Sequence, residues 1–142
     1  MPNSHPFADT TLISSYSRAD ALADGVLIDL SIIGQEAGLR FPVAITRAAW
    51  EAWIGWTDED TKRQTYQDEP GRAWDVVHML AVKLRAVTRS RPNDSNSRVE
   101  FQFYAVPRGG RGTRPRLTTL KCFCAPGDAA EPELTILTLT ED

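Results

Sequence analysis

The stretch that decides the fold is VEFQFYAVPRGGRGTRPRLTTLKCFC, residues 99–124. Its first part alternates apolar and polar side chains, with Phe101 and Phe103 in one phase and Glu100 and Gln102 in the other. Alternation of this kind predicts a β-strand with one buried face. The stretch therefore begins with a half-buried strand.

The centre of the stretch is RGGRGTRPR, residues 108–116, which holds three glycines and a proline. These residue types allow the chain to reverse, so we expect a hairpin tip here. LTTLKCFC, residues 117–124, then returns as a second strand, and ELTILTLT, residues 133–140, follows as a third. Because the apolar residues of the third run fall in both phases, we expect a bulge or a strand covered on both faces. Together the three strands predict an antiparallel meander.

Helical signals lie in the first two thirds of the chain. Ser17 is expected to cap a short helix that ends at Gly25, before a buried strand at 26–30. Thr46 is expected to cap a helix over RAAWEAWIGW, residues 47–56. The clearest pattern is RAWDVVHMLAVKLRAV, residues 72–87, whose apolar stripe predicts a long amphipathic helix.

Shorter segments complete the pattern. SIIGQEAGLR, residues 31–40, allows a helical turn or two, and FPVAI, residues 41–45, reads as a short edge strand because Pro42 cannot donate to a ladder. Helices first and strands last predict an α+β fold, in which the helices with Trp50, Trp53 and Leu80 cover the meander. The length of 142 residues suits a single domain, 1–142, with a loosely ordered N-terminal arm at about 1–11.

The segment TDEDTKRQTYQDEPG, residues 57–71, is polar and without periodicity, so we interpret it as a mobile surface loop. It is a candidate contact region, and Trp56 just before it is either packed in the core or partly exposed and available for binding. Tryptophan is among the residues enriched at binding hot spots. The predicted binding residues of this region are Trp56, Asp58, Glu59 and Asp60.

Charge is distributed unevenly along the chain, whose formal net charge is -3. Residues 85–116 hold eight arginines against two acidic residues, and both flanks are acidic. Guanidinium groups suit phosphates and carboxylates alike, so the hairpin tip is a candidate binding site, with Phe103 and Tyr104 available for base stacking. The alternative is that the arginines only keep a hairpin tip soluble. The candidate residues are Arg108, Arg111, Arg114 and Arg116.

No catalytic or metal-binding signature is found. Cys122 and Cys124, with only His5 and His78 elsewhere, make a poor zinc set, and we expect both cysteines to pack in the core. Asp75 lies three residues before His78 and could orient it as a general base, which keeps a small enzyme as a third hypothesis. We predict no catalytic residues, no metal and no cofactor. Without a long apolar run or a secretory signal, the expected location is the cytoplasm and no membrane partner is expected.

Five stretches carry a likeness to known proteins: LISSYSRADALADGVLIDLS, RFPVAITRAAWEAW, GRAWDVVHMLAVKLR, LKCFCAPGD and ELTILTLTED. Together they resemble a family of small uncharacterised proteins carried by bacterial phages, plasmids and other mobile elements. The resemblance implies a protein that binds and blocks host defence machinery, as anti-CRISPR proteins do.

From this we expect a non-enzymatic inhibitor that acts by protein–protein contact. Its partner would be a host protein or nucleoprotein complex, such as a CRISPR-Cas subunit. The alternative is a nucleic-acid-binding accessory or regulatory protein that uses the arginine-rich hairpin 108–116.

Overall fold

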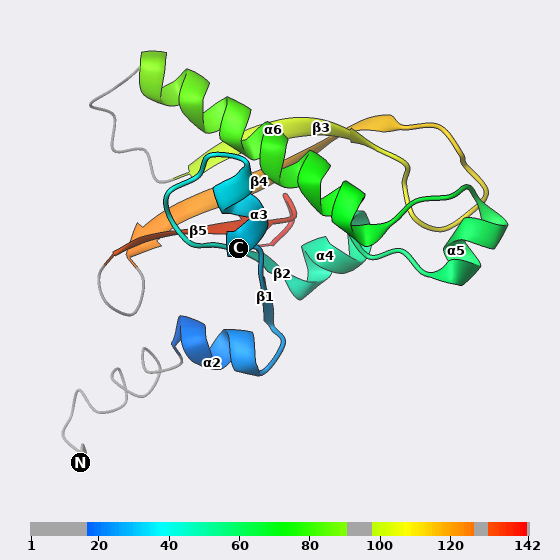
Figure 1. Ribbon diagram of the computed structural model, residues 1–142, viewed down its shortest axis with the longest axis horizontal. Coiled ribbons are helices and arrows are strands. Elements are labelled where there is room, and N and C mark those ends of the chain that lie inside the picture. Colours follow the sequence, from blue (N-terminus) through cyan, green and yellow to red (C-terminus); the bar gives the residue numbers. More distant parts are fainter. Residues whose placement is uncertain (1–16, 91–97, 127–130, 142) are drawn as a thin grey trace.

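The computed structural model describes residues 17–90, 98–126 and 131–141, and the predicted N-terminal arm lies outside these ranges (Figure 1). The described part is an α+β fold built on a five-stranded sheet with the order β1-β2-β5-β4-β3. Its elements in chain order are α2 (Arg18–Ala23), β1 (Leu27–Asp29), α3 (Ser31–Glu36), β2 (Val43–Thr46), α4 (Arg47–Trp53), α5 (Asp58–Arg63), α6 (Glu69–Ser90), β3 (Arg98–Ala105), β4 (Arg116–Pro126) and β5 (Pro132–Leu137).

The predicted C-terminal meander is confirmed. Strand β4 pairs antiparallel with β3 on one side and with β5 on the other, in regular registers. The expected alternation also holds: Phe101 and Phe103 are buried, whereas Gln102 and Tyr104 are exposed. Cys122 is buried in the core cluster, Cys124 packs against it, and both are free thiols.

The prediction that residues 41–45 form an edge strand was wrong. Strand β2 lies inside the sheet, antiparallel to β1 and parallel to β5. Pro42 does not prevent this, because the strand begins one residue later and Pro42 contributes only its carbonyl, which accepts from the Leu134 amide at 2.9 Å. The side chains of Val43, Ala44 and Ile45 are consequently buried.

Helices cover the apolar face of the meander as expected. Helix α6 lies along β3 (Figure 1). The side chains of Val76, Val77 and Leu80 on this helix are fully buried in the core. Helix α4 contributes Trp53, whose ring meets that of Phe103 edge-on with centroids 6.0 Å apart. The face of the hairpin next to α6 is thereby fixed in the core.

The prediction of a mobile loop over residues 57–71 was wrong. Thr57 accepts a hydrogen bond from the Asp60 amide at 3.1 Å, and the Asp60 carboxylate accepts from the Thr57 amide at 2.8 Å. This capping box starts α5, and α6 begins at Glu69, three residues before its expected start. Figure 1 places α5 beside the turn that joins β3 to β4.

The third strand ends earlier than its sequence suggests. Leu137 is buried in the phase opposite to Leu134 and Ile136, so β5 is covered on both faces at its end, and its register with β4 contains no bulge. Leu139 lies beyond the strand and is 45% exposed. The turn that follows is held by Glu141, whose carboxylate accepts from the Thr138 amide at 2.8 Å.

Candidate functional site

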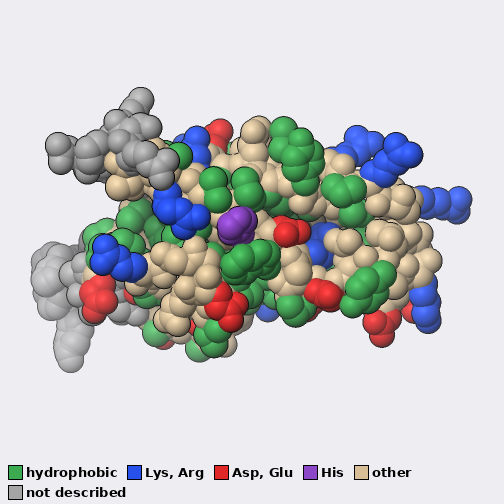
Figure 2. Space-filling model, turned by 45° about the horizontal axis from the view of Figure 1, so that its top comes forward, with side chains coloured by type: hydrophobic (Ala, Val, Ile, Leu, Met, Phe, Trp, Pro, Cys, Tyr) green, Lys and Arg blue, Asp and Glu red, His purple; other side chains and the backbone are tan. Residues whose placement is uncertain are grey.

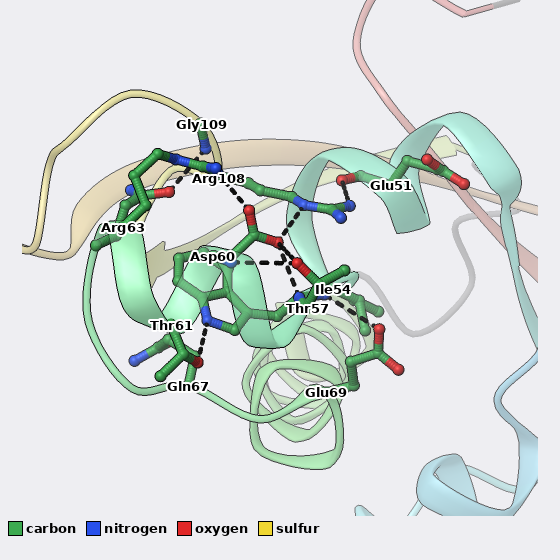
Figure 3. A network of polar contacts seen from close by, with 12 residues as sticks. Glu51, Ile54, Thr57, Asp60, Thr61, Arg63, Gln67, Glu69, Arg108 and Gly109 are labelled. Atoms are coloured by element: carbon green, nitrogen blue, oxygen red, sulfur yellow. Dashed lines mark hydrogen bonds and ion pairs between the residues drawn. The ribbon is translucent and has the colours of Figure 1, made fainter.

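The four arginines of the β3–β4 turn have two different roles. Arg108 points into the molecule, where its Nε donates to Asp60 Oδ2 at 2.8 Å and its Nη1 donates to the Glu51 carbonyl at 3.1 Å (Figure 3). Arg111, Arg114 and Arg116 are exposed. The predicted set of four therefore divides into one structural arginine and three available ones.

Asp60 is the centre of the polar network that holds Arg108. Its side chain is 5% exposed, and it also forms an ion pair with Arg63 (Figure 3). Hydrogen bonds from Thr57, the backbone amide above all, lower the pKa of Asp60 to about 2, with Arg108 contributing in the same direction and burial opposing it. Asp60 is therefore a buried anion and not a contact residue, which corrects its predicted role.

The next turn of the chain, at Gln64, fixes the loop itself. The Gln64 side-chain amide donates to the carbonyls of Pro107 at 2.9 Å and Gly112 at 2.7 Å, and its oxygen accepts from the Gly109 amide at 2.9 Å. Arg63 adds a bond from Nε to the Gly110 carbonyl at 3.1 Å. The backbone of the glycine-rich turn is thus hydrogen-bonded to residues at the end of α5 at positions 107, 109, 110 and 112.

Trp56 lies in the protein interior next to α5. It is 6% exposed, so the prediction of a partly exposed binding residue was wrong. Its Nε1 donates to Thr61 Oγ1 at 3.0 Å, and the guanidinium of Arg72 lies 4.5 Å from its ring centroid. Trp56 supports the start of α5 from inside the protein.

Arg72 joins this layer to the end of β3. It is 3% exposed, and it donates to the Ile54 carbonyl at 3.1 Å and to the Val106 carbonyl at 3.0 Å. Burial lowers its pKa from the ordinary value, with the nearby charge of Arg108 acting in the same direction. The β3–β4 turn is thus anchored at Val106 as well as at Arg108.

We call residues 107–116 the basic tip, because three of its arginines are exposed. Within the described part of the chain, the side chains of Arg111, Arg114 and Arg116 make no ion pair or hydrogen bond. Figure 2 shows lysine and arginine side chains gathered at this end of the molecule. The tip encloses an open hollow of about 620 Å³, which is lined by Pro107, Gly109, Gly110, Arg111, Gly112, Thr113, Arg114 and Arg116.

The acidic residues predicted as contacts are separated by the fold. Asp58 and Glu59 lie exposed in the first turn of α5, next to the tip, and Glu59 is 3.8 Å from Lys62. Asp60 points the other way, into the protein. The three do not form one patch, and among the residues described no group of His, Cys, Asp or Glu is arranged to hold a metal ion.

His78 and Asp75, the candidate general-base pair, both lie on α6. The His78 ring stacks on Trp74, with centroids 5.2 Å apart, and no hydrogen bond joins His78 to Asp75 in the region that the structure describes. Partial burial raises the pKa of Asp75 from its ordinary value. The pair lies on α6 and takes no part in the basic tip.

Fold and site together define an α+β domain that displays exposed arginines on a hairpin turn hydrogen-bonded to Arg63 and Gln64. None of its described helices combines the length and apolar character needed to cross a membrane. The chain belongs to a family of unknown function, DUF6573, whose model matches residues 3–142. No curated protein and no solved structure matches it.

Proposed function

We propose that this protein is a non-enzymatic binding protein and that the basic tip is the surface with which it holds an anionic partner. The observation that carries the proposal is that the polar side chains at the turn fall into two sets. Arg108, Gln64 and Asp60 form the hydrogen bonds that fix the loop. The second set is exposed and consists of Arg111, Arg114 and Arg116.

Rigid presentation favours binding for a physical reason. A flexible arginine-rich loop would lose conformational freedom on binding, which weakens affinity. The bonds from α5 order the loop backbone before any partner arrives. In addition, three neighbouring cations repel one another, and an anionic surface would relieve that repulsion while speeding association.

The partner we propose is a host nucleoprotein complex, and the role is inhibition of that complex by stoichiometric contact in the cytoplasm. What supports this choice of partner and role is the resemblance of the sequence to small proteins of phages and plasmids. Anti-CRISPR proteins, which inhibit host defence by binding it, are the example that we follow. A protein of this kind works by occupying a surface, so its activity should follow its binding.

A comparative pull-down tests the proposal. The tagged protein, its Arg111→Ala/Arg114→Ala/Arg116→Ala variant and an Arg40→Ala variant are each incubated with lysate of a bacterial host. Arg40 is exposed and lies in the segment before β2, far from the tip along the chain. The proposal expects one partner captured by the wild type and by Arg40→Ala but lost with the triple variant; equal capture by all three would contradict it.

A further inference from the structure

We propose that this protein forms a two-fold dimer, in which β3 of one copy pairs antiparallel with β3 of the other and the two α6 helices pack against each other. The contact uses the outer edge of β3 and the neighbouring side of α6, a surface that the proposed function leaves unused. Three features carry the inference: the open edge of a long strand, a groove beside that edge, and a charge pattern on α6 that is complementary to itself.

The outer edge of β3 is suited to pairing with another strand. The sheet order puts β3 at one end, so within the described ranges no strand lies on its outer side. β3 has eight residues in unbroken register with β4, whereas β1 at the other end of the sheet has three. Residues 99–105 of β3 contain no proline and a single charge, at Glu100. Exposed edge strands are normally protected by lysines, prolines or bulges, so a long edge without them favours pairing with another chain.

A groove lies between this edge and α6. It has a volume of about 450 Å³, and the residues that line it include Met79, Val82, Lys83 and Ala86 of α6 with Glu100 and Gln102 of β3. The helix therefore leaves the middle of the strand open to a close approach. Val82 is 39% exposed there, so a second apolar surface laid against α6 would remove apolar area from water.

The charges on α6 favour a second copy of this chain as the partner. Asp75, Met79 and Lys83 follow one another at intervals of four residues, so they share one face of the helix, and Asp75 and Lys83 are both exposed. When two α6 helices run antiparallel about a two-fold axis at Met79, Asp75 of each copy faces Lys83 of the other. An unrelated strand would have to bring both charges in this spacing, whereas a second copy supplies them by symmetry.

The same axis fixes the register of the two strands. Met79 and Gln102 line the same groove, so we place the axis at this pair. Gln102 then faces Gln102 of the other copy, and Glu100 faces Tyr104, so no like charges lie opposite each other on the joined strands. Both α6 helices lie on the same face of the joined sheet, and the two basic tips lie at opposite ends of the contact.

Analytical ultracentrifugation over a range of protein concentrations tests the inference. The wild type should have twice the mass of one chain at high concentration and should dissociate on dilution. Val82→Glu places a charge in the contact and should weaken dimerisation at least about tenfold. Val26→Glu is the matched control, because Val26 is 49% exposed beside β1 at the other end of the sheet, and it should dimerise as wild type. The mass of one chain at every concentration, or equal dimerisation of the two variants, would overturn the inference.

Charge reversal tests the pairing of the two helices. Lys83→Asp should weaken dimerisation at least about tenfold, because Asp75 of one copy then faces an aspartate of the other. The double variant Asp75→Lys/Lys83→Asp should dimerise again, because opposite charges then face each other across the axis. Thermal unfolding of each variant checks that the fold is intact. A folded double variant that stays monomeric would overturn the inference.

Cysteine substitution tests the register of the strands by a separate route. Gln102→Cys should give a disulfide-linked dimer under mild oxidation, because residues on the two-fold axis lie directly opposite each other. Tyr104→Cys is the control: Tyr104 is 64% exposed, but its equivalents in the two copies are four positions apart along the strands, roughly 13 Å, which is too far for a disulfide. The wild type gives the background from Cys122 and Cys124. A linked dimer from position 104 and not from position 102, or from neither, would overturn the inference.

The basic tip is tested separately from this contact. The Arg111→Ala/Arg114→Ala/Arg116→Ala variant should dimerise as wild type, because none of the three arginines lines the groove beside β3. Loss of the dimer in that variant would contradict the placement of the contact at the outer edge of β3.

Discussion

Arg108 and Asp60, 48 residues apart in the chain, are joined by a hydrogen bond of 2.8 Å from Arg108 Nε to Asp60 Oδ2. This contact fastens the turn between β3 and β4 to the short helix α5. Arg108 is therefore a structural residue of the hairpin. Removing either partner should therefore affect the folded state of the tip before it affects any contact made by the tip.

Asp60→Asn should lower the free energy of unfolding by roughly 2–3 kcal/mol, because Arg108 and Arg63 lose the anion that compensates them while remaining partly buried. Urea denaturation followed by tryptophan fluorescence measures the change. Asp58→Asn is the matched control: Asp58 is exposed two residues earlier in the same helix, and its replacement should cost less than about 0.5 kcal/mol. Equal losses for the two variants would show that Asp60 does not anchor the turn.

The same carboxylate predicts an acid sensitivity. Its pKa in the folded protein is about 2, against an ordinary 3.8. At pH values above the ordinary pKa, its charge therefore stabilises the fold by about 2 kcal/mol. That stability is lost as the pH falls from about 5 towards 2, because the unfolded chain takes up the proton first. The difference in unfolding free energy between wild type and Asp60→Asn should shrink over this range, and a constant difference would argue against the assignment.

Gln64→Ala should loosen the basic tip without unfolding the core. Three hydrogen bonds between the Gln64 amide and the loop backbone would be lost, at a cost of about 2 kcal/mol in total. Hydrogen exchange detects the local effect: the Gly109 amide should exchange faster while amides of β4 keep their protection. Gln35→Ala, at an exposed position in α3, provides the comparison and should leave exchange at Gly109 unchanged.

Truncation should destabilise the protein far more at Trp56 than at Trp74. Trp56→Ala should cost about 3–5 kcal/mol, because a buried ring, its bond to Thr61 and its contact with Arg72 are all lost. Trp74 is 37% exposed on α6, so Trp74→Ala should cost far less. Thermal unfolding of the two variants shows which substitution costs more stability. A larger loss for Trp74→Ala would refute the claim that Trp56 supports α5.

Sequence patterns predicted the fold where a periodicity is long and regular. The alternation around Phe101 and Phe103 and the stripe through Val77 and Leu80 both repeat over several turns or pairs, and the structure confirms both elements. The edge position predicted for β2 is wrong because Pro42 precedes the strand, so its missing N–H removes no hydrogen bond from the ladder. The position of a short strand in a sheet depends on its distant partners, here β5, which no local pattern reveals.

The site was predicted only in part. The exposure of Arg111, Arg114 and Arg116 follows from composition. The capping signal Thr57-x-x-Asp60 is present in the sequence, but it lies in a polar segment without the apolar periodicity that marks a helix. That signal alone predicts the start of α5. The roles of Arg108, Gln64 and Arg72 had no local signal, because each depends on a carbonyl or carboxylate brought near by tertiary packing.

Site-specific photo-crosslinking tests most directly the central claim that the basic tip is the contact surface. Benzoylphenylalanine is placed at Thr113, which lines the hollow, or at Glu36, which is exposed at the end of α3. The account predicts a crosslinked partner from position 113 that is absent from position 36 and is lost when Arg111, Arg114 and Arg116 are replaced by alanine. A partner crosslinked from position 36 and not from position 113 would contradict it.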